Sequence, residues 1–430
     1  MTEFDDAIYI VPSFIIQAKR RNCSKMEKES SIVAPELPKG FVAAGTACGV
    51  KKSGDPDLVL LYSESEAAVA AAFTTNRVAA APVRLSRQVA GTGRCRAVIA
   101  NSGCANAATG ERGEGDARRM AEATARLLGI DPGLVAVAST GRIGTYLPID
   151  RIEAGIEDLA GLIRSGGNSA AAEAIMTTDT RPKEIAREFE IGGRTARIWG
   201  IAKGAGMIYP RMRVAGEPHA TMFCFLLTDL GADPGLLRSA LAAALEESFN
   251  RITVDGDTST NDTVILLANG ASGVRAEPGT EGEKTFREIL ARVSRELAWM
   301  IVADGEGASK FVSIEVGGAK TAGDARRAAA AVANSLLFKC ALYGECPNWG
   351  RLLAALGYSG AEIAEDRISV SLGELEVVRA GLILDPAPER VGDVLREKRI
   401  DLRVDLGLGE GRDVYYTCDI SPEYVEINQG

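Results

Sequence analysis

The stretch EPHATMFCFLLTD, residues 217–229, places a histidine and a threonine directly before an apolar run. A threonine hydroxyl is a weak nucleophile unless a base lies beside it. Cleavage of the chain just before Thr221 would supply such a base, because a free α-amine has a pKa of about 7.7–8.0 in model peptides. The small residue Ala220 leaves room for attack on the peptide bond, and MFCFLL predicts a buried strand that holds Thr221 at its start. The alternative is a turn followed by a core strand without chemistry.

His219 is the only histidine among the 430 residues, which nearly excludes triads and dyads built on histidine. The eight cysteines are scattered and form no CxxC pair, a pattern typical of reduced thiols rather than of a disulfide framework. We therefore expect no metal site. His219 itself is interpreted as an exposed loop residue, and a role in cleavage or substrate contact is the alternative.

The net charge of −9 argues against nucleic acid or an anionic membrane as a partner. No apolar run approaches the roughly 18 residues of a membrane span. We expect a soluble, cytoplasmic protein. Residues 1–33 are interpreted as an N-terminal extension that is poorly ordered, or of which residues 1–25 are an incorrectly assigned start, with Met26 as the alternative start.

The elements that must position Thr221 are short strands that alternate with amphipathic helices, which predicts an α/β or α+β protein with helices covering sheets. A three- and four-residue apolar spacing predicts a helix over 117–128 with Asp116 as its N-cap. An alanine-rich helix is expected from Asp324 to about Leu337. No Walker or G-x-G-x-x-G pattern supports a nucleotide site. Strands are expected at 58–62, 97–100, 135–140, 263–269, 312–316, 368–372 and 413–420.

Long motifs in a fixed order carry a resemblance that covers about residues 32–428. The sequence resembles the ornithine acetyltransferase family, also called glutamate N-acetyltransferase, which belongs to arginine biosynthesis. The motifs are PKGFVAAGTACGVKKSGDPDL (38–58), NSGCANAATG (101–110), STGRIGTYLPID (139–150), IMTTDTRPK (175–183), KGAGMIYP (203–210), ATMFCFLLTD (220–229), FNRITVDGDTSTNDTVILLANG (249–270), MIVADGEGASK (300–310) and YGECPNWGRLLAALGYSG (343–360).

The resemblance implies an αββα-type sandwich, shared with a group of self-processing aminopeptidases. It also implies self-cleavage between Ala220 and Thr221 into an alpha chain, 34–220 behind the extension, and a beta chain, 221–430. Two copies of each would form a heterotetramer. The implied reaction moves acetyl from N-acetylornithine to glutamate through an acetyl-threonine, and acetyl-CoA is an open alternative donor. Such a reaction needs no metal or organic cofactor, because the acyl group is carried covalently on oxygen.

The residue roles also follow from the resemblance. Thr221 matches the nucleophile, and Thr140 with Gly141 matches the oxyanion-hole pair that stabilises a tetrahedral intermediate. Lys203 is a cation suited to the α-carboxylate of an amino acid. Glu306 suits the amine end of ornithine. The matched substrate contacts are Thr177, Lys203, Thr221, Glu306 and Asn428.

Several positions depart from the family pattern. Residues 213–219 form an insertion directly before Ala220, Cys104 and Cys346 replace an asparagine and an aspartate, and the chain ends at INQG, short of the usual tail. Two alternative functions therefore stay open: an acyltransferase or amidohydrolase for another N-acyl amino acid, and a non-catalytic amino-acid-binding relative. For DGDTSTNDT (255–263), a polar turn and support of the pocket are held as equal alternatives.

Overall fold

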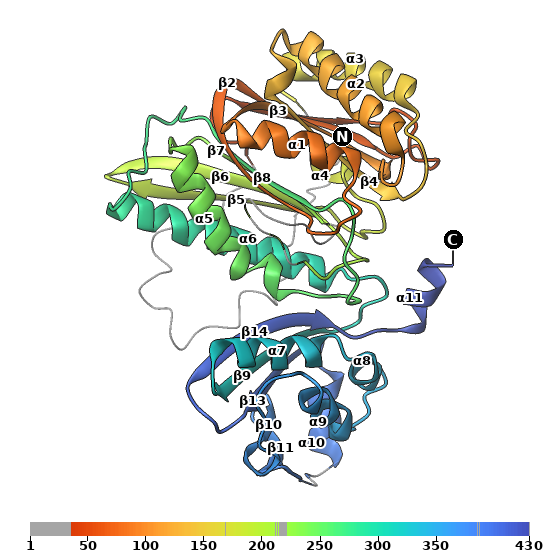
Figure 1. Cartoon of the computed structure of the whole chain (residues 1–430), viewed down its shortest axis with the longest axis vertical. Helices are drawn as coiled ribbons and strands as arrows, with labels where there is room; N and C mark the ends of the chain where they lie inside the picture. The colour runs from red at the N-terminus through yellow and green to blue at the C-terminus, as the bar shows by residue number, and fades with distance from the viewer. Residues whose placement is uncertain are drawn as a thin grey trace, which may run out of the picture.

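The structure is a computed structural model that describes residues 36–167, 169–210, 212, 214, 222–384, 386 and 388–429. The proposed extension, most of the insertion with His219, and the pair Ala220 and Thr221 lie outside the described residues. Within the described part, the chain forms an eight-stranded sheet and a six-stranded sheet, each accompanied by helices (Figure 1). No helix in these ranges is long and apolar enough to cross a membrane.

The larger sheet has the strand order β4-β3-β2-β8-β7-β6-β5, with β1 paired to β2. Neighbouring strands run antiparallel except for the parallel pairs β3–β4 and β7–β8. Its strands are β1 (Phe41–Thr46), β2 (Leu58–Phe73), β3 (Arg94–Cys104), β4 (Val135–Arg142), β5 (Lys183–Ile191), β6 (Arg194–Lys203), β7 (Phe223–Thr228) and β8 (Thr263–Ala268).

The larger sheet folds over on itself because β2 spans both of its halves. The pairing register of β2 with β3 shifts between Tyr62 and Ala67, and the second half of β2 then pairs with β8. One core cluster contains Val59 and Val98 from the first half together with Phe225 and Ile265 from the second. The two halves therefore pack face to face around a shared core.

Helices cover both outer faces of this double layer (Figure 1). Helices α2 and α3 share a core cluster with the outward residues of β3 and β4, and α5 and α6 share another with those of β7 and β8. The order is thus helix, sheet, sheet, helix, which confirms the expected αββα sandwich. The helices of this part are α1 (Ala81–Gly91), α2 (Gly110–Leu128), α3 (Ile149–Arg164), α4 (Ala171–Ala174), α5 (Pro234–Glu246) and α6 (Glu281–Ala303), with 3₁₀ turns at Pro132–Leu134 and Phe249–Arg251.

The smaller sheet has the order β12-β11-β10-β13-β9-β14. The inward residues of β9 pack against α7, α8 and α9, while Tyr416 of β14 lies edge-on to Trp299 of α6 at 5.3 Å between ring centroids and so joins the two parts. The elements are β9 (Phe311–Ala319), α7 (Ala322–Ala333), α8 (Leu336–Tyr343), α9 (Trp349–Gly357), a 3₁₀ turn at Glu365–Arg367, β10 (Ser369–Leu372), β11 (Leu375–Arg379), β12 (Leu382–Ile383), α10 (Pro388–Arg396), β13 (Arg399–Asp405), β14 (Gly411–Cys418) and α11 (Pro422–Ile427).

All seven expected strand segments lie wholly or largely in strands. The expected buried strand MFCFLL also lies in β7 except for Met222, and β7 is buried on both faces. Three helix boundaries were predicted wrongly. Helix α2 begins at Gly110, so Asp116 lies inside the helix rather than at its N-cap, because the glycine-rich segment before it continues the helix. Helix α7 begins at Ala322 behind the capping hydroxyl of Thr321, and it ends at Ala333, where Ser335 caps a separate helix.

We expect Phe225→Ala to destabilise the fold strongly. The Phe225 side chain is fully buried between the two sheet halves, with its ring centroid 5.5 Å from that of Phe223. Truncating a buried phenylalanine costs about 3–5 kcal/mol of unfolding free energy. Urea denaturation measures the loss, with Leu382→Ala as control because Leu382 is 72% exposed. A loss below about 1 kcal/mol for Phe225→Ala would contradict the double-layer core.

Candidate active site

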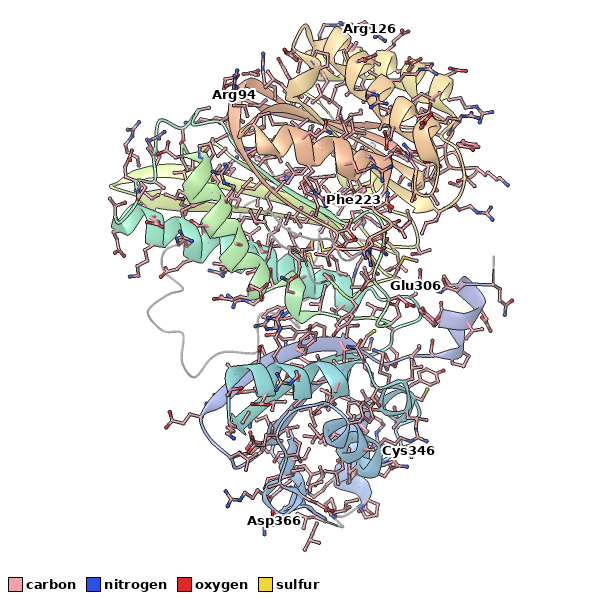
Figure 2. The ribbon with its side chains drawn as sticks, in the orientation of Figure 1. Arg94, Arg126, Phe223, Glu306, Cys346 and Asp366 are labelled. Atoms are coloured by element: carbon pink, nitrogen blue, oxygen red, sulfur yellow. The ribbon has the colours of Figure 1, made fainter. Side chains whose placement is uncertain are left out.

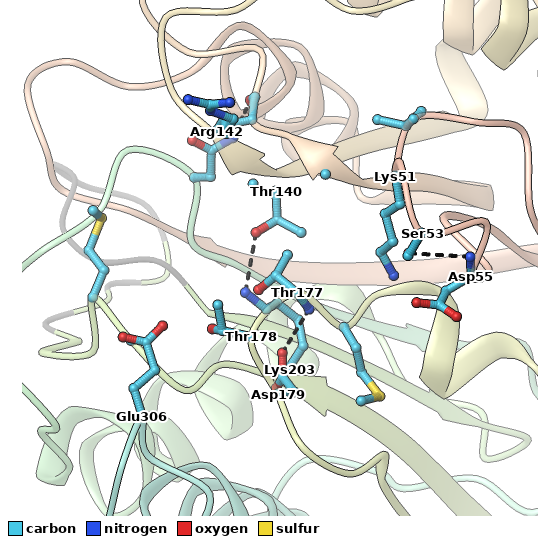
Figure 3. A pocket seen from close by; sticks show the side chains of 18 of the residues that line it. Lys51, Ser53, Asp55, Thr140, Arg142, Thr177, Thr178, Asp179, Lys203 and Glu306 are labelled. Atoms are coloured by element: carbon cyan, nitrogen blue, oxygen red, sulfur yellow. Dashed lines mark hydrogen bonds between the residues drawn. The ribbon is translucent and has the colours of Figure 1, made fainter. Parts of the chain in front are cut away.

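A cavity of about 910 Å³ opens beside the carboxyl ends of β4 and β6 (Figure 3). Residues from loops, strand ends and the end of α11 meet there, although they come from positions throughout the described chain. Six residues predicted from the sequence line this one cavity: Thr140, Gly141, Thr177, Lys203, Glu306 and Asn428. The structure therefore gathers every predicted site residue that it describes.

The wall of the cavity at Thr140 and Gly141 is fixed by close backbone packing. Gly141 has a φ of 125°, and a Cβ at this position would lie 2.3 Å from the carbonyl carbon of Gly103 on β3. Only glycine fits this conformation and this approach. Nearby, the Asn261 Nδ2 donates hydrogen bonds to the Ser139 carbonyl at 2.6 Å and the Ala105 carbonyl at 2.5 Å. The two candidate oxyanion residues are thus held rigidly.

Lys203 ends β6 with its side chain 3% exposed. Its Nζ donates a hydrogen bond of 3.3 Å to the Thr140 Oγ1. Burial lowers the pKa of Lys203, and the neighbouring Asp179 carboxylate offsets part of this decrease. A buried ammonium is stabilised by any anion that enters the cavity. The geometry therefore suits a carboxylate ligand at this wall.

A buried ion network positions the loop that carries Thr177. The Lys183 Nζ lies 2.6 Å from the Asp179 Oδ1 and 2.5 Å from the Asp304 Oδ2, and all three side chains are almost inaccessible to solvent. The backbone N–H groups of Gly204 and Thr177 donate to Asp179 at 2.7 Å and 3.0 Å. Burial alone would raise the pKa of Asp179, but the charges of Lys183 and Lys203 and the Gly204 N–H donor outweigh this effect and lower it. One carboxylate thus joins two walls of the cavity.

Glu306 and Asn428 form the far end of the site. The Asn428 Nδ2 donates a hydrogen bond of 2.7 Å to the Glu306 Oε2, so α11 brings the end of the chain to this carboxylate (Figure 2). The Glu306 backbone N–H donates to the Ala205 carbonyl at 2.9 Å. A Cβ at Gly206 would lie 2.3 Å from the Glu306 carboxylate, so this glycine leaves the space that the carboxylate fills.

The polar stretch DGDTSTNDT is both a turn and a support of the pocket. The Asp257 N–H donates to the Asp255 side chain at 3.1 Å, as in an Asx turn, whereas Ser259 and Asn261 line the cavity. Both interpretations are therefore confirmed. The sequence motifs predicted no individual role for Asn261, Asp179 or Lys183, and the four-residue spacing of Asp179 and Lys183 was the only sign of their pairing.

Asp262 is fully buried, and neither carboxylate oxygen has a hydrogen-bond partner among the described residues. Burial raises the pKa of Asp262 well above its ordinary value, and Lys203 opposes this increase only in part. The Thr263 N–H donates to the Met222 carbonyl at 3.0 Å, so Met222, which follows Thr221 in the sequence, lies beside this start of β8. A buried carboxyl group without donors favours its protonated form.

The model of the ArgJ family matches residues 42–430. The chain belongs to the ArgJ family. It is 49% identical to the arginine biosynthesis bifunctional protein ArgJ of Symbiobacterium thermophilum over 394 residues, 91% of this chain and 96% of that protein. It is 47% identical to the glutamate N-acetyltransferase of Methanocaldococcus jannaschii over 401 residues, again 91% and 96% of the two chains. The ornithine acetyltransferase of Mycobacterium tuberculosis, solved with ornithine, is 42% identical, with 43% of this chain and 99% of that chain covered and a TM-score of 0.39.

Membership of the ArgJ family makes the chain an acyltransferase of arginine biosynthesis, as the ordered motifs implied. The relatives match nearly end to end, so the resemblance is not confined to one motif. The cavity is the place where six of the residues carried over from the family motifs meet in this ArgJ-family chain.

We expect Asp262→Asn to make the fold more stable at neutral pH but not in acid. The raised pKa means that the folded state keeps the proton above the ordinary aspartate pKa of about 3.9, whereas the unfolded state releases it. The carboxyl group therefore lowers the free energy of unfolding more and more as pH rises from about 4 toward its folded-state pKa. An amide does not ionise, so Asp262→Asn removes this destabilisation. Melting temperatures from pH 4 to 8 measure the change, with the exposed Asp257→Asn as control. A difference between wild type and Asp262→Asn that stays constant over this range would contradict the expectation.

Proposed function

We propose that the chain is a glutamate N-acetyltransferase that moves acetyl from N-acetylornithine to glutamate in the cytoplasm. The observation that carries this proposal is the single cavity that combines Thr140 and Gly141 with a buried cation, Lys203, and a carboxylate, Glu306. The names of the relatives support the same substrates. A charged amino acid needs both signs of charge in its site, and acyl transfer needs donors for an oxyanion.

The proposed nucleophile is the Thr221 hydroxyl, freed by self-cleavage between Ala220 and Thr221. Its oxygen bonds to the acetyl carbon while its proton passes to the new α-amine. Donors at Thr140 and Gly141 stabilise the charge on the carbonyl oxygen. The C–N bond to ornithine then breaks, the leaving nitrogen takes the proton, and acetyl-Thr221 remains. The glutamate amine attacks this ester by the same steps in reverse.

Substrate recognition follows from the two ends of the cavity. Lys203 pairs with the α-carboxylate of the donor because its ammonium has no carboxylate within ion-pair distance among the described residues. Glu306, oriented by the amide of Asn428, receives the side-chain ammonium of ornithine. Thr177 contributes a polar contact on the wall that Asp179 fixes.

Cleavage would leave an alpha chain, 34–220 behind the extension, and a beta chain, 221–430. The two pieces would stay together, because Lys203 at the end of β6 is paired with Phe223 at the start of β7, and β2 is paired with β8. We propose a heterotetramer with two copies of each chain. Acetyl-CoA as a second donor belongs to the same proposal and is tested by supplying it in place of N-acetylornithine.

Thr221→Ala should remain one uncut chain of about 45.3 kDa and should be inactive, because the variant has no hydroxyl for cleavage or transfer. Intact-mass measurement on purified protein detects the cut. Thr221→Ser keeps a β-hydroxyl and is expected to yield a fragment that begins at residue 221. A Thr221→Ala protein that is both cut and active would refute the proposed mechanism.

N-acetylornithine should be converted to ornithine with matching formation of acetylglutamate when glutamate is present. Chromatography of the products with and without glutamate makes the measurement. Release of free acetate both with and without glutamate, with no acetylglutamate formed, would instead identify an amidohydrolase. Binding of either amino acid without any product would identify a non-catalytic relative.

A further inference from the structure

Besides Lys203, the cavity is lined by lysines for which neither the motifs nor the proposed function has a role. Lys51 lies in the loop between β1 and β2 and lines the cavity together with Lys203. The loop is held by the fully buried Asp57, whose carboxylate accepts N–H hydrogen bonds from Cys48 at 2.7 Å, Val50 at 2.6 Å and Lys51 at 2.9 Å. Lys51 is therefore anchored at its backbone and not on a loosely held loop.

The ammonium of Lys51 is only partly satisfied. Its Nζ donates one hydrogen bond, of 2.7 Å, to the Pro56 carbonyl, and it forms no ion pair with any carboxylate in the described part of the chain. A lysine ammonium has three donors, so two remain. Lys51 is partly buried, and this burial lowers the pKa of its ammonium, while the negative charges of Asp57 and Asp55 oppose the decrease. An anion at this point of the cavity would be favoured.

Lys51, Lys203 and Glu306, three of the charged residues that line the cavity, form a series across it. Figure 3 shows Lys203 between Lys51 on one side and Glu306 on the other. The electrostatic interactions are consistent with this order, because the charge of Lys203 lowers the pKa of Lys51 and the charge of Glu306 raises the pKa of Lys203. A central cation thus has a second cation on one side and an anion on the other.

The proposed reaction requires one site to bind two amino acids with oppositely charged side chains. Donor and acceptor both carry an α-carboxylate, but the side chain of ornithine is cationic and that of glutamate is anionic. A carboxylate placed against Glu306 would meet a like charge in a partly desolvated site, which is unfavourable. The acceptor therefore needs a cation away from Glu306, and Lys51 supplies one.

We propose that Lys51 binds the side-chain carboxylate of the acceptor glutamate and so determines acceptor specificity, an inference that rests on the proposed function. Lys203 holds the α-carboxylate in both half-reactions. Glu306 serves the donor, and Lys51 serves the acceptor. No covalent step is added, since Lys51 acts only by charge and hydrogen bonding.

Lys51→Met tests this inference, with Lys52→Met as the matched control. Lys52 is the exposed neighbour on the same rim, so the control removes the same charge from the same loop. Three quantities are measured on the full protein: the burst of ornithine released from N-acetylornithine, the KM for glutamate, and transfer of acetyl to labelled ornithine.

For Lys51→Met we expect the KM for glutamate to rise about tenfold or more, because a charge-assisted hydrogen bond is lost. The ornithine burst and the transfer to labelled ornithine should stay within about twofold of wild type, which also shows that the variant is folded. Lys51→Arg should restore much of the glutamate KM. Lys52→Met should leave all three quantities unchanged.

The inference would be overturned if Lys51→Met reduced the ornithine burst and the transfer to labelled ornithine by the same factor as it raised the KM for glutamate. Lys51 would then only support the fold of the loop. An unchanged KM for glutamate, or the same rise in Lys52→Met, would overturn it as well. Failure of the proposed function looks different: wild-type protein itself would then give no ornithine burst from N-acetylornithine.

Discussion

The candidate site depends on the buried ammonium of Lys183 between the carboxylates of Asp179 and Asp304. Removing one partner from such a group leaves uncompensated charge in the interior, which costs about 3–5 kcal/mol. The network matters mainly for position, because Asp179 also accepts the backbone N–H groups of Thr177 and Gly204. The segment that carries Thr177 and the turn after Lys203 are therefore held together by this carboxylate.

The four-layer sandwich explains why distant segments meet at this network. Parallel strands β3 and β4 end at one edge of the folded sheet, and β6 ends at the same cavity. The smaller sheet is joined to α6 through Trp299 and Tyr416, so the chain after β14 returns to the sandwich. Helix α11 then places Asn428 on Glu306. The cavity is complete only when the C-terminal segment is in place.

The sequence predicted the layers better than the details of the site. Continuous apolar runs predicted β7 and β8, because a strand buried on both faces is apolar at nearly every position. It misplaced the start of α2, since glycine-rich residues gave no apolar signal for the first helical turns. Ordered motifs identified Lys203 and Glu306. They did not reveal the role of Asn261, which depends on contacts with residues far away in the chain, such as the Ser139 carbonyl. Nor did they reveal the complete burial of Asp262, which depends on how the layers pack around it. A polar residue in a turn looks the same in the sequence whether it is buried or exposed.

The hydrogen bond between Lys203 and Thr140 has a direction that matters for acyl transfer. An ammonium can only donate, so the Thr140 Oγ1 must accept at 3.3 Å, and the hydroxyl proton of Thr140 stays available for another acceptor. The same contact adds positive charge next to that hydroxyl, which makes it a stronger donor. Because Gly141 and Asn261 hold this strand end rigidly, the donor is oriented before any oxyanion forms. Stabilisation by fixed dipoles of this kind needs no reorganisation when the charge develops. Lys203 therefore has two effects in the proposed reaction: it attracts the substrate carboxylate, and it orients the group that stabilises the transition state.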